Sequence, residues 1–521
     1  MGSMTSEPAS AEPADLAARA AEKHVVVVGG GIGGLIAARE CAKVGMRVTV
    51  LEAADELGGA IRRVELDGVV IDAGAESYAT RGGVVRALVD ELGLTDRVVA
   101  PRPGGAWVAG VPGVGAAPLP VGGILGIPAN PFQEDVRRIL GWSGVWRAYL
   151  DRVRPPLTIG HQLSLGRLVA SRMGDKVRDR LVAPVTTGVY SASPDDVDTD
   201  VAAPGLNAAL TRVGSLSGAV QALRQDAASR TAGPAGAAKA PGAAVEGLAG
   251  GMIGLVDALA ADVRGLGVEV RTGARVRTVR RADDTWTVDV ELPVPDTAAG
   301  PADPSAHSAD AVDAVDELEE LVADAVVVAT SESVARALLA GVVPALVSAD
   351  AVVSPEIEIV TLLLDAPELD AAPRGTGVLT VPGSHTAKAL THSTAKWAWV
   401  REAAGARHIV RVSFGSQGEP AATADLDDDA ATDLARSEAA TMLGVPLRPE
   451  SVVASHRGRF VQSQPASIIG SGERRAAARA AVQAVPGLAA VGAWLAGTGL
   501  AQVVPDAREE ADRLRRALLW E

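Results

Sequence analysis

Residues 25–52 read VVVVGGGIGGLIAARECAKVGMRVTVLE, and this stretch decides the fold of the first part of the chain. An unbroken run of valines is typical of a strand that is buried on both faces of a parallel sheet. The segment LIAARECAKVG after the glycines has helical periodicity, and MRVTVLE returns to a strand pattern. The stretch therefore predicts a strand, a glycine turn, a helix and a second strand, the repeating unit of an α/β protein.

The glycines follow the spacing Gly29-x-Gly31-x-x-Gly34. In such a loop the first glycine permits a tight turn, the second lets the backbone approach a diphosphate, and the third lets the helix pack against the strand. The N–H groups at the helix start would face the phosphates, and Glu52, at the end of the second strand, could accept hydrogen bonds from a ribose. A glycine-rich turn that binds nothing is the alternative. The order of the elements favours dinucleotide binding.

The composition excludes several classes of protein. The chain has 521 residues, of which 48% are hydrophobic, so two or more domains are expected. Its net charge of −15, without any block of lysines or arginines, argues against binding to nucleic acid. Cys41 is the only cysteine, so no intrachain disulfide can form, and we expect a cytoplasmic protein. Four prolines interrupt the apolar stretch 111–129, which predicts a loop and no transmembrane span.

The chain after the glycine stretch alternates between helical and strand patterns. Residues 250–267 predict an amphipathic helix, 268–281 a pair of short strands, and 132–185 a mostly helical region. Further strands are expected at 285–292, 323–330, 356–365 and 408–414. We expect a discontinuous α/β domain threaded by a second, mixed domain, divided as follows: 1–22, disordered N-terminus; 23–100, 246–345 and 456–521, the three cofactor-binding parts; 101–225, a substrate and helical domain; 346–455, a substrate-binding sheet; 226–245 and 294–320, flexible insertions of low complexity.

A second glycine pair, Gly58-Gly59, comes shortly after Glu52, and VVIDAGAESY follows at 69–78. The run from Val25 to Arg62 resembles the FAD-binding fingerprint of the glutathione-reductase-type flavoproteins, in particular the amine oxidase and protoporphyrinogen oxidase superfamily. The segments LAGGMIGLVDALA, ADAVVVAT, KALTHSTAKWAWV and VGAWLAGTGLAQVVPDA extend the likeness over nearly the whole chain. It is most similar to the coproporphyrinogen III oxidases of Gram-positive bacteria. The resemblance implies a Rossmann-like FAD-binding domain interleaved with a mixed-sheet substrate domain and a helical subdomain.

The resemblance also implies where FAD binds. We expect the bond to FAD to be non-covalent, because no His or Cys occupies the family's linkage position. A helix that starts near Leu500 would direct its positive end at the flavin. Ala60 stands where the family often has a basic residue, and Arg62 is the expected substitute. The matching residues are Gly29, Gly30, Gly31, Ile32, Gly33, Gly34, Glu52, Ala53, Gly59, Ala60, Arg62, Gly74, Ala75, Glu76, Ser77, Val276, Gly492, Gly499, Leu500, Ala501 and Val504.

The substrate side departs from the family pattern. The family's Gln, Tyr and His near the C-terminus are Ala466, Ser467 and Ser471 here. The histidines are scattered, with no metal spacing and no triad, so we expect neither a metal nor a dedicated catalytic residue. The substrate's propionates need cations, and Arg81 and Lys396 are the candidates.

The activity implied by the resemblance is an FAD-dependent, six-electron oxidation of coproporphyrinogen III to coproporphyrin III in haem biosynthesis. Molecular oxygen would accept the electrons, with H2O2 formed, and the product would pass by transient contact to the next enzyme of the pathway. Three alternatives remain: a protoporphyrinogen IX oxidase, a related flavin amine oxidase or desaturase, and a Rab-escort-like lipid carrier without flavin. The C-terminal GTG segment and the second glycine pair argue against the carrier.

Overall fold

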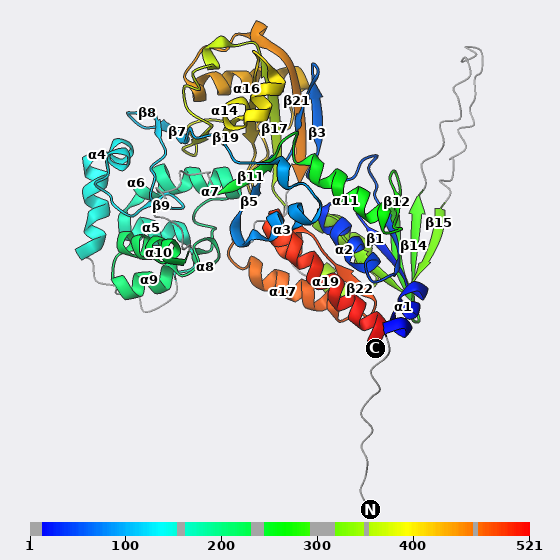
Figure 1. The fold of residues 1–521 in the computed structure, drawn as a ribbon. Coiled ribbons are helices and arrows are strands. Elements are labelled where there is room, and N and C mark those ends of the chain that lie inside the picture. The colour runs from blue at the N-terminus through cyan, green and yellow to red at the C-terminus, as the bar shows by residue number, and fades with distance from the viewer. Residues whose placement is uncertain are drawn as a thin grey trace, which may run out of the picture.

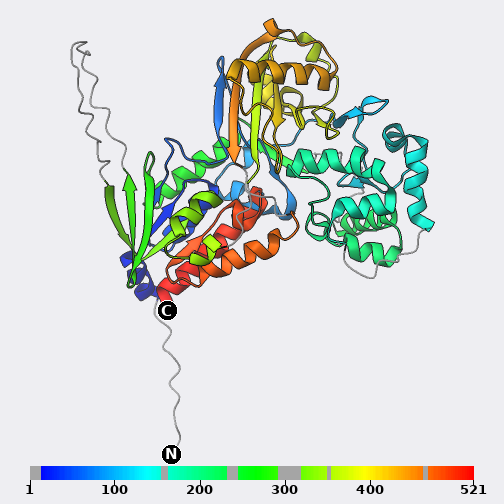
Figure 2. The ribbon, with the colours of Figure 1, turned by 180° about the vertical axis from the view of Figure 1, so that it is seen from behind.

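The computed structural model describes residues 13–153, 162–230, 244–291, 318–348, 354–461 and 467–520. Figures 1 and 2 show three bodies: one built on a parallel sheet, one on a larger mixed sheet, and one of helices. Both the N-terminal and the C-terminal helix belong to the first body (Figure 1). The fold is thus mixed α/β, as predicted.

The first body is organised by a five-stranded parallel sheet in the order β12-β2-β1-β16-β22. Its central strand, β1, is buried at every position, as expected for its run of valines. Val26 pairs with Thr49 of β2 on one side and with Val326 of β16 on the other. The strands are β1 (His24–Val28), β2 (Arg47–Leu51), β12 (Glu269–Arg271), β16 (Ala325–Val328) and β22 (Leu488–Ala490).

The two faces of this sheet are covered differently. Val25 and Val27 belong to a core shared with helices α2 (Ile32–Ala42), α11 (Ile253–Gly265) and α19 (Leu500–Trp520). Val26 and Val28 belong to the core of the opposite face, where the fully buried Trp286 lies. That face carries the antiparallel sheet β13 (Arg275–Ala282), β14 (Thr285–Glu291) and β15 (Leu318–Ala323). Because both faces are covered, the central strands β1 and β16 and the edge strand β22 are almost wholly apolar, whereas the edge strand β12 carries Glu269 and Arg271.

The second body is a seven-stranded sheet in the order β21-β17-β20-β19-β18-β7-β8. Its neighbours are antiparallel except for the pair β18–β7. Helix α16 (Asp428–Leu443) packs on one face, and the hairpin β3–β4 with α15 (Ala398–Ala404) packs on the other. The strands are β7 (Ala106–Val111), β8 (Gly115–Pro118), β17 (Glu356–Leu364), β18 (Gly377–Thr380), β19 (Ala389–His392), β20 (His408–Phe414), β21 (Val452–Val461), β3 (Arg63–Leu66) and β4 (Val69–Asp72).

The third body is helical, and its hydrophobic core also takes in Val108 and Val111 of β7 and Ala117 of β8. Its α7 meets the seven-stranded sheet closely, since a Cβ on Gly188 would lie 2.5 Å from the Leu379 side chain. The helices are α4 (Glu134–Tyr149), η3 (Leu150–Val153), α5 (Leu165–Met173), α6 (Asp175–Val177), η4 (Arg178–Val182), α7 (Ala183–Tyr190), α8 (Thr199–Ala202), α9 (Leu206–Val213) and α10 (Leu216–Arg230).

Shorter elements connect the three bodies. Strand β11 pairs with β5 and with β6, and so links the chain after the helical body to the segment that follows β4. Five further helices pack in the two cores of the first body: α3 (Val84–Glu91), α12 (Glu332–Leu339), α13 (Pro344–Ser348), α17 (Ser471–Gln483) and α18 (Ala493–Ala496). The other short elements are β5 (Tyr78–Ala79), η1 (Arg81–Gly83), η2 (Thr95–Arg97), β6 (Val98–Val99), β11 (Val245–Leu248), η5 (Pro367–Leu369), α14 (Ser393–Lys396) and η6 (Pro449–Ser451).

Three sequence-based expectations about local structure were wrong. Within the segment expected to be disordered, residues 13–22 form helix α1 (Pro13–Glu22), because Leu16 and Ala20 pack against the core of the first body. The expected loop 111–129 contains β8 and the short strands β9 (Gly123–Ile124) and β10 (Ile127–Pro128). The strands expected to pair within 268–281 belong to two sheets: β12 joins β2, and β13 joins β14.

The predicted division of the chain differs from the observed elements at several edges. The boundary at 455 falls inside β21, which pairs with β17 along its length and so belongs to the seven-stranded sheet. The insertion 226–245 begins within α10 and ends in β11, and 294–320 ends in β15. Residues 231–243 and 292–317, like residues 1–12, lie outside the described part of the chain.

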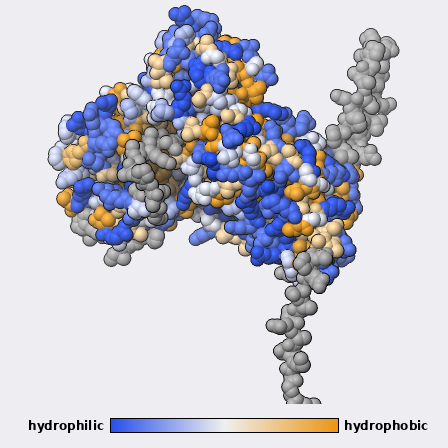
Figure 3. Space-filling model, in the orientation of Figure 1, coloured by the Kyte–Doolittle hydropathy of each residue, from blue (hydrophilic) through white to orange (hydrophobic). Residues whose placement is uncertain are grey.

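Hydrophilic and hydrophobic residues are interspersed over all three bodies on the face shown in Figure 3. Among the described residues, no helix combines the length and the apolar character that crossing a bilayer requires.

We expect Trp286→Ala to destabilise the first body strongly. The side chain is fully buried between the parallel sheet and the β13–β14–β15 layer, and truncating a buried tryptophan costs about 3–5 kcal/mol. Trp520→Ala is the matched control, because that side chain is 60% exposed. The midpoint of thermal unfolding should fall clearly for the first variant only; equal shifts would show that Trp286 does not hold the layers together.

Candidate cofactor and substrate site

The glycine loop leaves the carboxyl end of β1 in a conformation that side chains would prevent. Gly29 has φ +109°, and a Cβ there would lie 2.7 Å from the Ala329 carbonyl oxygen. A Cβ on Gly34 would lie 2.0 Å from the Gly29 carbonyl oxygen. Both glycines are therefore required for α2 to start close to β1, whatever the loop binds.

Gly31 differs from these two glycines. Its φ of −73° is accessible to any residue, and a Cβ would find only the Gly59 Cα, at 3.9 Å. The first helical bond of α2 runs from Leu35 N to Gly31 O, so the N–H groups of the first turn have no partner within the helix. Open space in front of a helix N-terminus fits an anionic diphosphate.

Glu52 ends β2 beside this loop. Its carboxylate accepts hydrogen bonds from Gly30 N at 2.7 Å and from Ala54 N at 2.9 Å, while Ala53 is exposed. The turn between β12 and β13 is joined to the same segment, because Ala274 N donates to Glu52 O. Val276 follows on β13, two residues after this contact, and its part in an adenosine site stays a prediction.

The second glycine pair lies against the first loop. Gly58 N donates to Gly30 O at 3.0 Å, and Arg62 Nε donates to Gly59 O at 2.8 Å. The exposed Arg62 therefore places a cation next to the open space at Gly31, while Ala60 contributes none. Farther along, a Cβ on Gly74 would lie 2.2 Å from the Ala60 carbonyl oxygen, so the two segments pass each other closely.

The C-terminal segment reaches the same place. A Cβ on Gly33 would lie 3.5 Å from Gly492 Cα and 3.4 Å from Val503 Cγ1. Helix α19 begins at Leu500, as predicted, just after Gly499, which has φ +102°. Leu500 and Ala501 pack at the edge of the core, whereas Val504 is fully buried within it. The C-terminal segment therefore packs against the glycine loop.

Glu76 joins the cofactor-binding segment to the seven-stranded sheet. Its carboxylate is 2.5 Å from Lys396 Nζ and 3.1 Å from Arg411 Nη1. Burial alone would raise the pKa of Glu76, but the two cations outweigh it and hold the pKa at about 2. Arg411, on β20, also donates to the Ala73 carbonyl at 2.8 Å. Lys396 therefore already has a carboxylate partner. Ala75 and Ser77 lie on either side of Glu76 in the same loop.

Two further cations lie near the carboxyl end of α7. Arg81 is exposed in η1, and its charge opposes the rise in the pKa of Tyr190 that burial causes. Lys388 is 7% exposed, and its Nζ donates to Ser191 Oγ at 2.6 Å. Burial lowers the pKa of Lys388 to about 7. Lys388 belongs to the segment KALTHSTAKWAWV, but nothing in the sequence distinguishes it from an exposed lysine.

Asp72 is a second group that the sequence did not reveal. It ends β4 just before the Gly74–Ser77 loop and is 4% exposed. Its Oδ1 accepts a hydrogen bond from Met252 N at 2.8 Å, while its Oδ2 is buried without a partner. Burial raises the pKa of Asp72 to about 7. The clue in the sequence is an acidic residue directly after the apolar run VVI.

Two of the scattered histidines lie close together in the fold. Among the described residues, no group of His, Cys, Asp and Glu has the arrangement of a metal site. His392 and His408 form no recognisable motif in the sequence, but in the fold His392 Nε2 lies 3.2 Å from His408 Nδ1.

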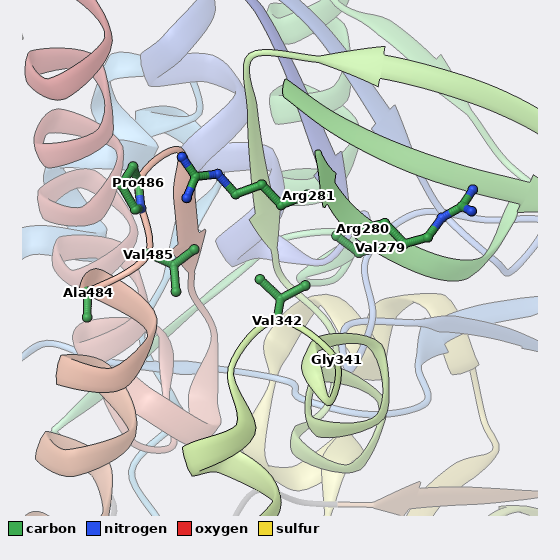
Figure 4. Close-up of a pocket in the computed structure, with 8 residues that line it drawn as sticks. All are labelled: Val279, Arg280, Arg281, Gly341, Val342, Ala484, Val485 and Pro486. Atoms are coloured by element: carbon green, nitrogen blue, oxygen red, sulfur yellow. The ribbon is translucent and has the colours of Figure 1, made fainter. Parts of the chain in front are cut away.

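An open hollow of about 570 Å³ lies elsewhere, between β13 and the turns at 341–342 and 484–486. Figure 4 shows Val342 and Val485 facing it, with the Arg281 side chain extending toward Pro486 and that of Arg280 extending away. None of the predicted site residues lines this hollow.

Comparison with known proteins agrees with the geometry of the glycine loop. The family profile described as flavin containing amine oxidoreductase matches residues 32–515. The chain belongs to this family. The flavoprotein is 28% identical to a coproporphyrinogen III oxidase of Propionibacterium freudenreichii, over 95% of this chain and 91% of the relative. It is 30% identical to a coproporphyrinogen III oxidase of Mycobacterium bovis, over 91% of this chain and 93% of the relative.

Solved structures show the same fold. The flavoprotein superimposes with a TM-score of 0.75 and 22% identity on a protein from Exiguobacterium sp. 255-15 assigned to the protoporphyrinogen oxidases, covering 95% of this chain and 99% of the other. A putrescine oxidase bound to putrescine gives a TM-score of 0.60 at 16% identity, covering 96% and 99%. The predicted resemblance to porphyrinogen oxidases within the amine oxidase superfamily is therefore confirmed, and FAD is the cofactor that the loop geometry fits.

We expect Gly31→Ala to fold but to lose FAD. The new methyl group meets no protein atom closer than 3.9 Å, yet it projects into the space in front of the α2 N-terminus. The ratio of flavin absorbance to protein absorbance after purification measures the loss. Gly34→Ala is the contrasting variant: its methyl group would collide with the Gly29 carbonyl, so it should lower the unfolding midpoint of the protein itself. A Gly31→Ala variant that retains all its flavin would contradict the assignment of this loop.

Asp72 should make stability depend on pH. The unfolded chain ionises this carboxyl near pH 4, whereas the folded protein retains the proton up to about pH 7. Between these values the folded state binds the extra proton, so this group disfavours folding as the pH rises, by on the order of 1 kcal/mol per pH unit. Relative to the native protein, Asp72→Asn should therefore gain unfolding midpoint from about pH 4 to about pH 7, and no further above.

The control for this experiment is Asp284→Asn, which removes one carboxylate from a fully exposed turn. A difference between Asp72→Asn and the native protein that stays constant over the whole pH range would show that folding does not raise the pKa of Asp72.

Proposed function

We propose that this flavoprotein oxidises coproporphyrinogen III to coproporphyrin III, with FAD bound non-covalently, molecular oxygen as the electron acceptor and H2O2 as the reduced product. The two relatives described above are named coproporphyrinogen III oxidase, and the chain aligns with nearly the whole length of each. This supports haem biosynthesis as the setting and a porphyrinogen as the substrate. The expected contact with the next enzyme of the pathway stays a prediction.

The FAD site of this proposal follows the observed strand order. The parallel sheet has the order β12-β2-β1-β16-β22. When these five strands alone are numbered along the chain, the order is third, second, first, fourth, fifth, which is the order of Rossmann-like dinucleotide-binding domains. Residues 29–34 and Arg62 would hold the diphosphate, Glu52 with Ala53 the ribose, and Val276 the adenine. Gly59, Ala60, Gly74, Ala75, Glu76 and Ser77 would line the path of the flavin, and Gly492 and Gly499 to Val504 would cover its pyrimidine end.

The reaction makes modest demands on the protein side chains. Six hydrogens leave the tetrapyrrole in three two-electron rounds, and FAD, when bound, supplies the capacity to accept each pair of electrons. The chain's own residues bind the macrocycle, orient one carbon bridge at a time and exclude water. Asp72, with a pKa of about 7, is a buried group next to the flavin-lining loop that can hold a proton at neutral pH.

The observation that carries the substrate assignment is the pair of cations at the end of α7. Among the described residues, neither Arg81 nor Lys388 forms an ion pair with a carboxylate, whereas Lys396 is paired with Glu76. A buried ammonium group without a counter-ion is costly, and a bound carboxylate would offset that cost. We therefore assign propionate binding to Arg81 and Lys388. The part predicted for Lys396 becomes indirect, through Glu76.

Protoporphyrinogen IX is the second candidate substrate. The Exiguobacterium protein that shares this fold is assigned to the protoporphyrinogen oxidases, and a mitochondrial protoporphyrinogen oxidase of Nicotiana tabacum is 27% identical over 51% of the chain. The two substrates differ at two ring positions, where the first has propionates and the second has vinyl groups. Unpaired cations favour the substrate with more carboxylates.

The deciding measurement is the ratio of kcat/KM values for the two porphyrinogens. We expect coproporphyrinogen III to be favoured, and both Arg81→Ala and Lys388→Met to raise its KM by about tenfold, because a hydrogen bond to a charged group contributes about 1.5–3 kcal/mol. Arg516→Gln, at a side chain that is 72% exposed on α19, is the control.

Faster turnover of protoporphyrinogen IX by the native protein would overturn the substrate assignment. An unchanged KM in both variants would show that Arg81 and Lys388 do not bind the substrate, without contradicting the proposed reaction.

A further inference from the structure

A small cavity of about 150 Å³ lies beside α14, and neither Glu76 nor Lys396 lines it. One water molecule takes up about 30 Å³ in the liquid, so the cavity has room for a small ion. Its polar lining comes from Arg102, Asp370, His392, Thr394, Arg401 and His408. The proposed oxidation uses none of them.

The fixed charges around the cavity are predominantly positive. Arg102 and Arg401 face a single carboxylate, Asp370, whose side chain is 70% exposed. Arg401 is held in place because its Nη2 donates to the carbonyl groups of Gly405 and Arg407. The side chain of Arg102 forms no hydrogen bond or ion pair with any of the described residues. The cavity thus offers one anchored and one uncommitted guanidinium group.

A chain of hydrogen bonds determines the state of the two histidines. Asp370 Oδ1 lies 3.1 Å from His408 Nε2, and His408 Nδ1 lies 3.2 Å from His392 Nε2. Since a carboxylate only accepts, His408 donates from Nε2 to Asp370. Its Nδ1 is then an acceptor, which His392 Nε2 shares with Arg401 Nη1 at 3.2 Å and Thr394 Oγ1 at 3.3 Å. His392 is 1% exposed, and its remaining nitrogen, Nδ1, is buried without a partner. A buried polar atom without a partner costs free energy, which a ligand in the cavity could recover.

We propose that this cavity binds a small oxyanion, a carboxylate or phosphate group, together with one proton. The anion lies between the guanidinium groups of Arg102 and Arg401, and the proton, taken up from solvent, sits on His392 Nδ1 and is shared with an oxygen of the anion. No bond other than these hydrogen bonds forms or breaks. None of the residues assigned above to FAD or to the porphyrinogen lines the cavity, so the proposal does not depend on that assignment.

The charges that face His392 explain why the proton comes with the anion. Burial lowers the pKa of His392 to about 4, and His408 and Arg401 act in the same direction. Burial and Arg401 lower the pKa of His408, against the opposing effect of Asp370. Without an anion both rings are therefore neutral near pH 7. An anion reverses the balance at His392, so its affinity should fall about tenfold for each unit of rising pH while the complex keeps the proton.

The test uses the full-length protein with FAD bound and sulfate as the probe, because sulfate itself does not titrate near neutral pH. Sulfate is titrated against the unfolding midpoint at about pH 6 and about pH 7, with chloride adjusted to keep the ionic strength constant. We expect saturable stabilisation whose half-saturating concentration is about tenfold lower at the lower pH. Arg102→Gln should weaken binding about tenfold or more, while Arg516→Gln should leave it unchanged.

A second variant tests the proton. In His392→Asn the side-chain amide can donate from nearly the same place as Nδ1 without titrating, so sulfate should still bind, but independently of pH. Acetate and inorganic phosphate, titrated in the same way, identify whether the cavity prefers a carboxylate or a phosphate group. No saturable effect in the native protein, or an equal effect in Arg102→Gln, would overturn the site. An unchanged pH dependence in His392→Asn would overturn the role of the proton.

Discussion

The close approach of helix α2 to strand β1 is the constraint on which the rest of the structure depends. It is possible only because positions 29 and 34 lack side chains: a Cβ on Gly34 would lie 2.0 Å from the Gly29 carbonyl oxygen. With α2 in this position, its N-terminal N–H groups lie at the edge where the carboxyl ends of the parallel strands meet. The same contact lets Gly33 meet Gly492 and Val503, so the last helix of the chain closes on the first loop. A single steric condition thus assembles a site from residues more than 400 positions apart in the sequence.

The second constraint is electrostatic, and it joins the loop after β4 to the seven-stranded sheet. Glu76 lies in the loop after β4, while its partners Lys396 and Arg411 belong to the seven-stranded body. Removing one member of such a buried group leaves an uncompensated charge, which usually costs about 3–5 kcal/mol. The loop that should line the flavin is therefore held by the body that should hold the substrate. A shift of this loop relative to the seven-stranded sheet would be opposed at this contact.

The success of sequence-based prediction followed the range of the interactions. The strand, glycine turn, helix and strand at 25–52 were predictable because each depends on residues within a few positions, and the strand at 408–414 matches β20 residue for residue. The pairing within 268–281 was wrong because the turn at Gly273 sends β12 and β13 into different sheets, a choice that distant partners decide. Helix α1 was missed for a similar reason. Its alanine-rich sequence shows little apolar character, and it is the contact of Leu16 and Ala20 with the core that makes this segment part of the fold.

The charged residues show the limit most clearly. Lys388 and Lys396 occur in the same short segment, and no local pattern tells which of them is committed to an ion pair. The tertiary structure determines it. Lys396 forms an ion pair with Glu76, which lies 320 positions earlier in the sequence, and Lys388 is buried against the hydroxyl group of Ser191. Burial without a carboxylate partner lowers the pKa of Lys388 to about 7. Beside Lys396, the carboxylate of Glu76 has its pKa held at about 2, although burial alone would raise it. The same reasoning applies to His392 and His408, which look unremarkable in the sequence and become a coupled pair only when β19 and β20 lie side by side. Whether a charged side chain is free to bind a ligand is therefore a property of the tertiary structure, because it depends on which opposite charges the fold has already brought to it.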